Sequence, residues 1–131
     1  MNWSGAPGES QKENYRISEK INPGKGTAII AIFGIGEEII PPTPVKVKEG
    51  DTVLTATVSL LKRKKIPYDI SGSGPIAYVR GIHHLYEFDR GPLSGWIFKK
   101  NGEIVGHSSG VEPVSPGDQI EWFFTDDYTQ Y

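Results

Sequence analysis

The sequence predicts an α+β domain, in which a mixed sheet of about five strands carries one main helix on one face. Two features of the composition indicate the sheet. Isoleucine and valine together number 23 against 5 leucines, and 16 glycines and 10 prolines supply many turns. Branching at Cβ restricts χ1 and suits a pleated strand better than a helix. The helix is indicated by residues 52–61, whose apolar side chains recur at helical spacing.

The composition also limits the function. The 131 residues include no cysteine, which excludes disulfides, thiolate zinc sites and cysteine nucleophiles. A net charge of -2 argues against a nucleic-acid partner, since such binders usually carry a basic surface. No apolar run approaches the roughly 20 residues that cross a bilayer, so we expect no transmembrane segment in this chain.

The polarity of the chain suggests three regions. Residues 1–25 are polar and are expected to form a flexible lead or tether, residues 26–126 the domain, and residues 127–131 a polar tail. The start of the chain does not have the features of an export signal. This leaves two interpretations, a cytosolic protein or an exported one whose signal has been removed.

The first half of the domain is expected to contain two strands and the helix. Residues 27–35 are almost continuously apolar, which indicates a strand covered on both faces. Residues 37–48 are extended but contain three prolines, which places their first half at a sheet edge or outside it. Asp51 is a suitable N-cap for the helix. The run Lys62-Arg63-Lys64-Lys65 fits either a solvated helix end or a phosphate-binding patch, and we favour the first.

The second half is expected to contain strands only. Residues 76–82 form one strand, and residues 83–91 connect it to the next. Asn101-Gly102 lies between two apolar runs, which is the strongest short-range signal for a β-hairpin. Residues 120–124 form the last strand. The order of these elements, with a helix crossing the sheet after a two-stranded start, resembles the β-grasp type of α+β fold.

Few residues form a recognisable catalytic or metal-binding pattern. Gly34-Ile35-Gly36 follows a strand, but prolines rather than a helix come next, so we interpret it as a turn. A short cluster of potential metal ligands lacks a second supporting motif, so a polar connector is the favoured interpretation; it comprises His83, His84, Glu87 and Asp89. No acid–base pair with credible spacing emerges, so an enzyme ranks behind the non-enzymatic hypotheses.

The aromatic residues are concentrated in the last 54 residues. Trp96 and Phe98 share one face of their strand, and Trp122 and Phe124 share one face of theirs. We expect one pair to lie in the core and the other to be exposed as a platform for a flat or apolar ligand.

An ordered series in this half resembles the transcobalamin-like C-terminal domain family. The series runs Leu85-Tyr86-Glu87-Phe88-Asp89, Gly91, Ser94-Gly95-Trp96, Asn101-Gly102, Gly106 and Pro116-Gly117-Asp118-Gln119-Ile120-Glu121-Trp122. Members occur in bacterial surface and lipoprotein-type proteins. They are similar to the small β-domain of intrinsic factor and transcobalamin, the animal vitamin B12 carriers. The likeness covers about residues 27–125.

The resemblance implies a non-enzymatic, extracytoplasmic ligand-binding module. Its ligand would be cobalamin or a related corrinoid, with no cofactor required. The positions that match the family's ligand-facing hairpin and the following loop are Trp96, Phe98, Gly106, His107, Ser108 and Ser109. The resemblance also implies an extracellular or cell-surface location, with a membrane anchor in the native protein. Partners would be a membrane transporter or a surface protein.

The alternative is a structural or protein-interaction module of the cell surface with no small-molecule ligand. In that case the aromatic residues are core, and the proline-bearing edge at residues 39–47 could pair with another chain. Burial of Trp96 and Phe98 would favour this alternative, whereas an exposed cluster beside a concave surface would favour ligand binding.

Overall fold

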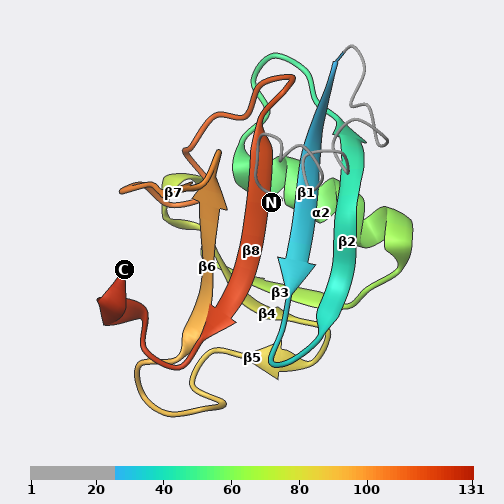
Figure 1. The fold of residues 1–131 in the computed structure, drawn as a ribbon. Helices are drawn as coiled ribbons and strands as arrows, with labels where there is room; N and C mark the ends of the chain where they lie inside the picture. Colours follow the sequence, from blue (N-terminus) through green and yellow to red (C-terminus); the bar gives the residue numbers. More distant parts are fainter. Residues whose placement is uncertain (1–25) are drawn as a thin grey trace.

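A computed structural model describes residues 26–131 of the chain. The expected polar lead, residues 1–25, lies outside the described residues. The architecture is α+β, as predicted: five strands form a mixed sheet, and one main helix packs on one of its faces (Figure 1). The finer assignment to the β-grasp type stays a prediction. No helix in residues 26–131 has the length and apolar character needed to cross a membrane.

The main sheet is built from both ends of the described chain. Its strands are β1 (Thr27–Phe33), β2 (Glu38–Lys46), β6 (Gly95–Lys100), β7 (Glu103–Ile104) and β8 (Gln119–Thr125), in the order β2-β1-β8-β6-β7. The pair β1–β8 is parallel, and the other pairs are antiparallel. β1 is therefore interior, and its residues 28–32 are buried on both faces, as their continuous apolar run predicts. β2 can contain three prolines, which have no N–H group to donate, because it lies at the sheet edge.

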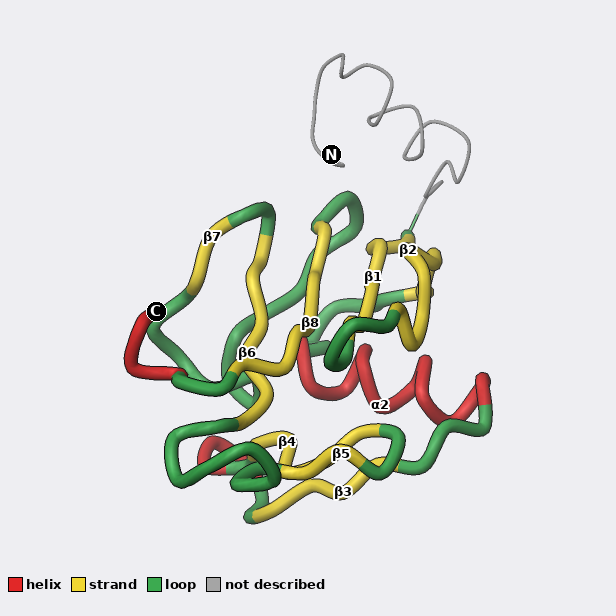
Figure 2. Tube along the Cα trace, turned by 60° about the horizontal axis from the view of Figure 1, so that its bottom comes forward, coloured by secondary structure: helices red, strands yellow, loops and turns green. Residues whose placement is uncertain are grey.

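A second, three-stranded sheet was not predicted. It contains β3 (Tyr68–Ser71), β4 (Tyr78–Ile82) and β5 (Leu85–Tyr86), in antiparallel order. Figure 2 shows this sheet and helix α2 (Val53–Lys64) on the same side of the main sheet. Strand β5 occupies part of the segment that we expected to be a simple connector. Ile76, expected in a strand, instead ends the 3₁₀ helix η1 (Gly74–Ile76) and is exposed.

Helix α2 begins one residue later than predicted. Thr52, rather than Asp51, is its N-cap, because the Thr52 hydroxyl accepts from Thr55 N at 3.2 Å and the Thr55 hydroxyl accepts from Thr52 N at 2.9 Å. Asp51 instead closes the preceding turn, where its carboxylate accepts from Lys48 N at 2.9 Å. This backbone hydrogen bond is the main reason why the pKa of Asp51 is lowered. The basic residues end the helix, and Lys65 is its left-handed C-cap, as expected for a solvated helix end.

The core lies between the main sheet and the layer formed by helix α2 and the second sheet. It joins β1 residues such as Ile30 and Ile32 to Leu60 of α2 and to Val79 and Ile82 of the second sheet. The remaining buried apolar members come from β1, β2, α2, β6, β8 and the loops beside them. One continuous core therefore connects both sheets and the helix.

Candidate functional site

Both aromatic pairs of β6 and β8 face the interior. Trp96 pairs with Phe124 and Phe98 with Trp122 across the two antiparallel strands, so all four side chains lie on the same face of the sheet. The ring centroids are 5.5 Å apart in the first pair and 5.1 Å in the second. Trp96 and Phe98 are 8% exposed, Trp122 is 2% and Phe124 is 9%. The expectation that one pair would be exposed as a platform is therefore wrong.

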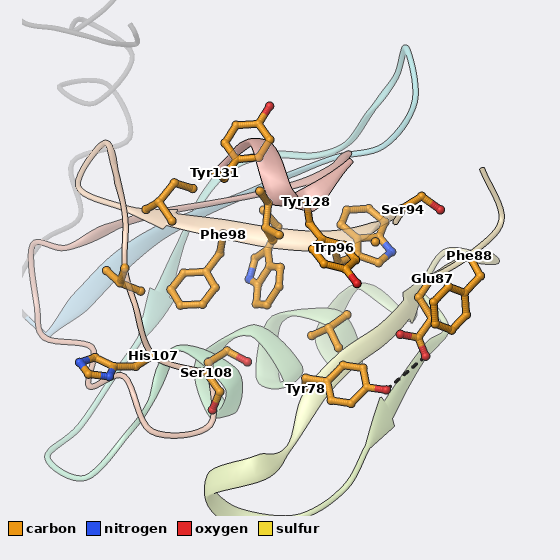
Figure 3. Close-up of a pocket in the computed structure, with 17 residues that line it drawn as sticks. Tyr78, Glu87, Phe88, Ser94, Trp96, Phe98, His107, Ser108, Tyr128 and Tyr131 are labelled. Carbon is orange, nitrogen blue, oxygen red and sulfur yellow. Dashed lines mark hydrogen bonds between the residues drawn. The ribbon is translucent and has the colours of Figure 1, made fainter. Parts of the chain in front are cut away.

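Three of these rings, those of Trp96, Phe98 and Trp122, nevertheless line a pocket of about 430 Å³. Figure 3 shows Trp96 and Phe98 pointing from β6 toward Tyr78 on β4, with His107 and Ser108 on the loop at one side. The pocket thus lies beside the β6–β7 hairpin, between the two sheets. Its described lining consists of Tyr78, Val79, Glu87, Phe88, Ser94, Gly95, Trp96, Ile97, Phe98, Ile104, Val105, His107, Ser108, Ser109, Trp122, Tyr128 and Tyr131.

Hydrogen bonds to the indole nitrogens fix the two tryptophans in the pocket wall. Trp96 Nε1 donates to the carbonyl of Leu85 at 2.9 Å, and Trp122 Nε1 donates to the Thr57 hydroxyl of α2 at 2.9 Å. Both indole N–H groups are thus satisfied by the protein. The rings offer a ligand their apolar surfaces, so the wall suits a flat or apolar molecule.

The loop after the hairpin is held against the helix N-terminus. The backbone N–H groups of Val53 and Leu54 donate to the carbonyls of Glu112 and Ser109, each at 2.9 Å. At Gly110 an added Cβ would lie 2.7 Å from the carbonyl oxygen of Gly74, so only glycine fits there without a shift. These contacts fix the position of Ser109 in the pocket wall.

An ion pair joins the same loop to the hairpin. Lys100 Nζ lies 3.0 Å from Glu112 Oε2 and 2.9 Å from the carbonyl of Pro113. It also lies 3.9 Å from the Asp118 carboxylate. The lysine and the glutamate are largely buried, so this pair holds the two sides of the site together.

The rim of the pocket is aromatic and partly exposed. Phe88 is 60% exposed, and Tyr78, Tyr128 and Tyr131 are also exposed. The Tyr78 hydroxyl donates to Glu87 Oε2 at 3.2 Å, the contact drawn as a dashed line in Figure 3. An apolar wall beneath such a rim can take up an apolar or aromatic group from solution.

The C-terminal segment contributes to this rim. The segment expected to be a polar tail, residues 127–131, contains the 3₁₀ helix η2 (Tyr128–Gln130). Tyr128 N donates to the carbonyl of Leu93 at 2.9 Å, and the Tyr131 ring packs edge-on against Phe123 at 5.3 Å. Two tyrosines at the end of a short polar segment were the only sequence signal for this role.

The structure brings together five of the six residues that the family resemblance proposes. Trp96, Phe98, His107, Ser108 and Ser109 line the pocket, and the neighbouring Gly106 is not part of the lining. Sequence reasoning missed the contributions of β4, of the segment around Phe88 and of the C-terminus. These residues join the site only through the packing of the second sheet and of η2 against β6.

The cluster of potential metal ligands does not converge. Glu87 accepts from Tyr78, the Asp89 carboxylate accepts from Tyr86 N at 2.8 Å, and His83 lies 3.7 Å from Glu37. Within residues 26–131, no three histidine or acidic side chains are grouped so that they could hold a metal ion. Each of these side chains thus has a separate partner.

The fold and the pocket define an α+β module with an aromatic site of ligand size. The chain belongs to the family described as a domain of unknown function, DUF4430, which matches residues 50–126. Among curated proteins, none matches this sequence significantly.

Two solved structures share the fold. Haptocorrin in complex with Cbi is similar with a TM-score of 0.62 and 18% identity, over 77% of this chain and 25% of haptocorrin. This chain therefore spans about a quarter of that protein. A candidate metal-binding protein from Ruminococcus gnavus ATCC 29149 is similar with a TM-score of 0.54 and 16% identity, over 77% of this chain and 97% of that one. The resemblance to transcobalamin-like proteins is thus supported at the level of the fold.

Proposed function

We propose that the chain is a non-enzymatic ligand-binding module that holds one side of a corrinoid in the pocket beside the β6–β7 hairpin. The observation that carries this proposal is the aromatic pocket itself, on a fold that is similar to haptocorrin in complex with Cbi. Trp96 and Phe98 supply the apolar wall, and His107, Ser108 and Ser109 the polar side. Gly106 would allow the loop to turn toward the ligand.

The size of the pocket limits how a corrinoid would sit. A volume of about 430 Å³ lies near the lower end of ordinary small-molecule sites. A corrinoid is larger than a drug-sized molecule, so only part of it would enter and the rest would lie across the rim of Phe88, Tyr128 and Tyr131. A second surface, on another domain or a partner, would then cover the exposed part. We propose a cell-surface or extracellular location with a membrane anchor, where the partner is a transporter or another surface protein.

The polar groups of the pocket favour binding over catalysis. His107 is the histidine that lines it, and no hydrogen bond in residues 26–131 joins its ring to a hydroxyl or a carboxylate. A general base needs such a partner to be oriented. The carboxylate of Glu87 is engaged with Tyr78 instead.

Titration with cobalamin tests the proposal, followed by calorimetry and by tryptophan fluorescence. We expect quenching that saturates, because Trp96 and Trp122 lie in the pocket wall. Phe88→Ala should weaken binding by about two- to ten-fold through the loss of one stacking surface. Ile76→Ala is the matched control, since Ile76 is exposed and is not part of the lining. No heat and no quenching at high micromolar cobalamin would overturn the corrinoid assignment.

The alternative is a structural or protein-interaction module with no small-molecule ligand, and the burial of Trp96 and Phe98 favours it. The proline-bearing edge strand β2 argues against pairing with another chain there. Pro41, Pro42 and Pro44 have no N–H group to donate to an added strand. The pocket next to the buried rings is the concave surface that favours ligand binding.

A further inference from the structure

Ser109 is a buried residue of the pocket wall, and its hydroxyl group has no hydrogen-bond partner within residues 26–131. Ser109 is 3% exposed, and its backbone carbonyl is used by Leu54 N. Its side chain makes no hydrogen bond to any part of residues 26–131. The neighbouring serines are different, since Ser108 Oγ donates to the Pro75 carbonyl at 2.9 Å and Ser94 Oγ to the Gly91 carbonyl at 2.9 Å. A buried hydroxyl is costly when it is unpaired, so this group is suited to pair with a ligand.

The described lining of the pocket contains no lysine or arginine. Its charged side chain is Glu87, and His107 is the one other residue that could take a charge. The nearby cations are held elsewhere. Lys100 is paired with Glu112 at 3.0 Å, and Arg80 Nε donates to Asp69 Oδ2 at 3.0 Å. An anionic group that entered the pocket would lose its hydration without gaining a cationic partner.

We infer that the pocket selects uncharged ligand groups, with an apolar body against the tryptophans and an amide or hydroxyl that hydrogen-bonds to Ser109. Carboxylates and phosphates are rejected by desolvation and by the Glu87 carboxylate. The inference rests on the proposed function and sharpens it. The peripheral amides of a corrinoid have the selected chemistry, and a phosphate-bearing part would stay outside.

Two probes of similar shape test the selection, the uncharged 3-phenylpropionamide and the anionic 3-phenylpropionate. Binding to the full chain is followed by the NMR signals of the tryptophan indole N–H groups. We expect the amide to shift signals of Trp96 and Trp122, and the carboxylate to bind at least about ten-fold more weakly. Equal binding of the two probes, or tighter binding of the carboxylate, would refute the charge selection.

Variants separate the roles of the two polar groups. Ser109→Ala should weaken the amide by about two- to ten-fold, the range for one lost hydrogen bond. The same variant should unfold at the same temperature or higher, because it removes an unpaired buried hydroxyl. Glu87→Gln should strengthen binding of the carboxylate probe. Ser71→Ala is the control, since Ser71 is half-buried in β3 and is not part of the lining.

The outcomes keep this inference apart from the corrinoid proposal. Loss of stability in Ser109→Ala with unchanged amide binding would show a structural hydroxyl and overturn its role as ligand partner. If neither probe shifts the indole signals, the selection is wrong, whatever the cobalamin titration gives. If the amide binds as expected and cobalamin does not, the pocket chemistry stands and the corrinoid assignment falls.

Discussion

The hydrogen bond between Trp122 and Thr57 joins the main sheet to helix α2, and its removal should cost much of the stability of the fold. Thr57 is 0% exposed and Trp122 is 2%. Thr57→Val replaces the hydroxyl by a methyl group of similar size, so packing is preserved while the indole N–H loses its acceptor. An unsatisfied buried donor costs about 1–3 kcal/mol, which is the destabilisation that we expect.

Urea and thermal unfolding measure this change. At about 2.1 cal/mol/K of unfolding entropy per residue, 1 kcal/mol corresponds to about 4–5 °C in Tm for roughly 100 residues, so Thr57→Val should lower Tm by at least about 4 °C. Thr57→Ser is the control, because it keeps the hydroxyl and removes only one methyl group. In a Trp122→Phe background the N–H group is gone, and Thr57→Val should then be neutral or stabilising.

The double-mutant cycle decides whether the reasoning is correct. Residues coupled by a buried hydrogen bond show interaction energies of about 0.5–3 kcal/mol, whereas independent sites add within about 0.5 kcal/mol. Additive effects of Thr57→Val and Trp122→Phe would refute the claim that this bond anchors the sheet to the helix.

Three further predictions concern the rest of the framework. In Gly81→Ala the new Cβ would lie 2.5 Å from the nearest atom of the Tyr86 ring, so the ring should be displaced and Tm lowered by several degrees. Gly102→Ala is the control, because its positive φ strains the backbone while no atom lies within 4 Å of the new Cβ. Lys100→Met should cost about 3 kcal/mol in urea unfolding by leaving the Glu112 carboxylate unpaired and largely buried, and Lys100→Met with Glu112→Gln should recover most of it. Folding lowers the pKa of Asp51, so this carboxylate contributes its full stabilisation at pH above its ordinary pKa of 3.8 and loses it as pH falls through the lower folded-state pKa. Asp51→Asn should therefore make the free energy of unfolding fall less steeply on acidification. An unchanged acid dependence would contradict this.

The elements that local chemistry determines could be predicted from the sequence. Asn101 and Gly102 both have positive φ, as a two-residue hairpin turn requires. The continuous apolar run of β1 predicted its interior place in the sheet. The helix start was wrong by one residue, since Asp51 and Thr52 are both good caps and only the reciprocal bonds with Thr55 select Thr52.

The assembly of the site could not be predicted in this way. The alternation of Trp96 and Phe98 shows that they share a face of β6, but not which way that face points. The direction depends on the register with β8, which places Trp122 opposite Phe98 and turns both pairs inward. Strand β5 pairs locally with β4 across a two-residue turn at His83 and His84, which lacks the Asn-Gly type of signal that marks the other hairpin. Helix η2 contacts the distant Leu93, so no local pattern indicated that Tyr128 would reach the pocket.

The parallel pairing of β1 with β8 determines when the main sheet can first be completed during synthesis of the chain. Ile29 lies opposite Gln119, so the middle of the sheet can form only after a segment about 90 residues further along the chain has been synthesised. A nascent chain stopped before that point would lack β8, the strand that lies between β1 and β6 in the complete sheet. Such long-range closure is slow. A fragment of residues 50–126, the stretch shared with the family, would keep β6 but lack β1, the other neighbour of β8, and is expected to remain unfolded by itself.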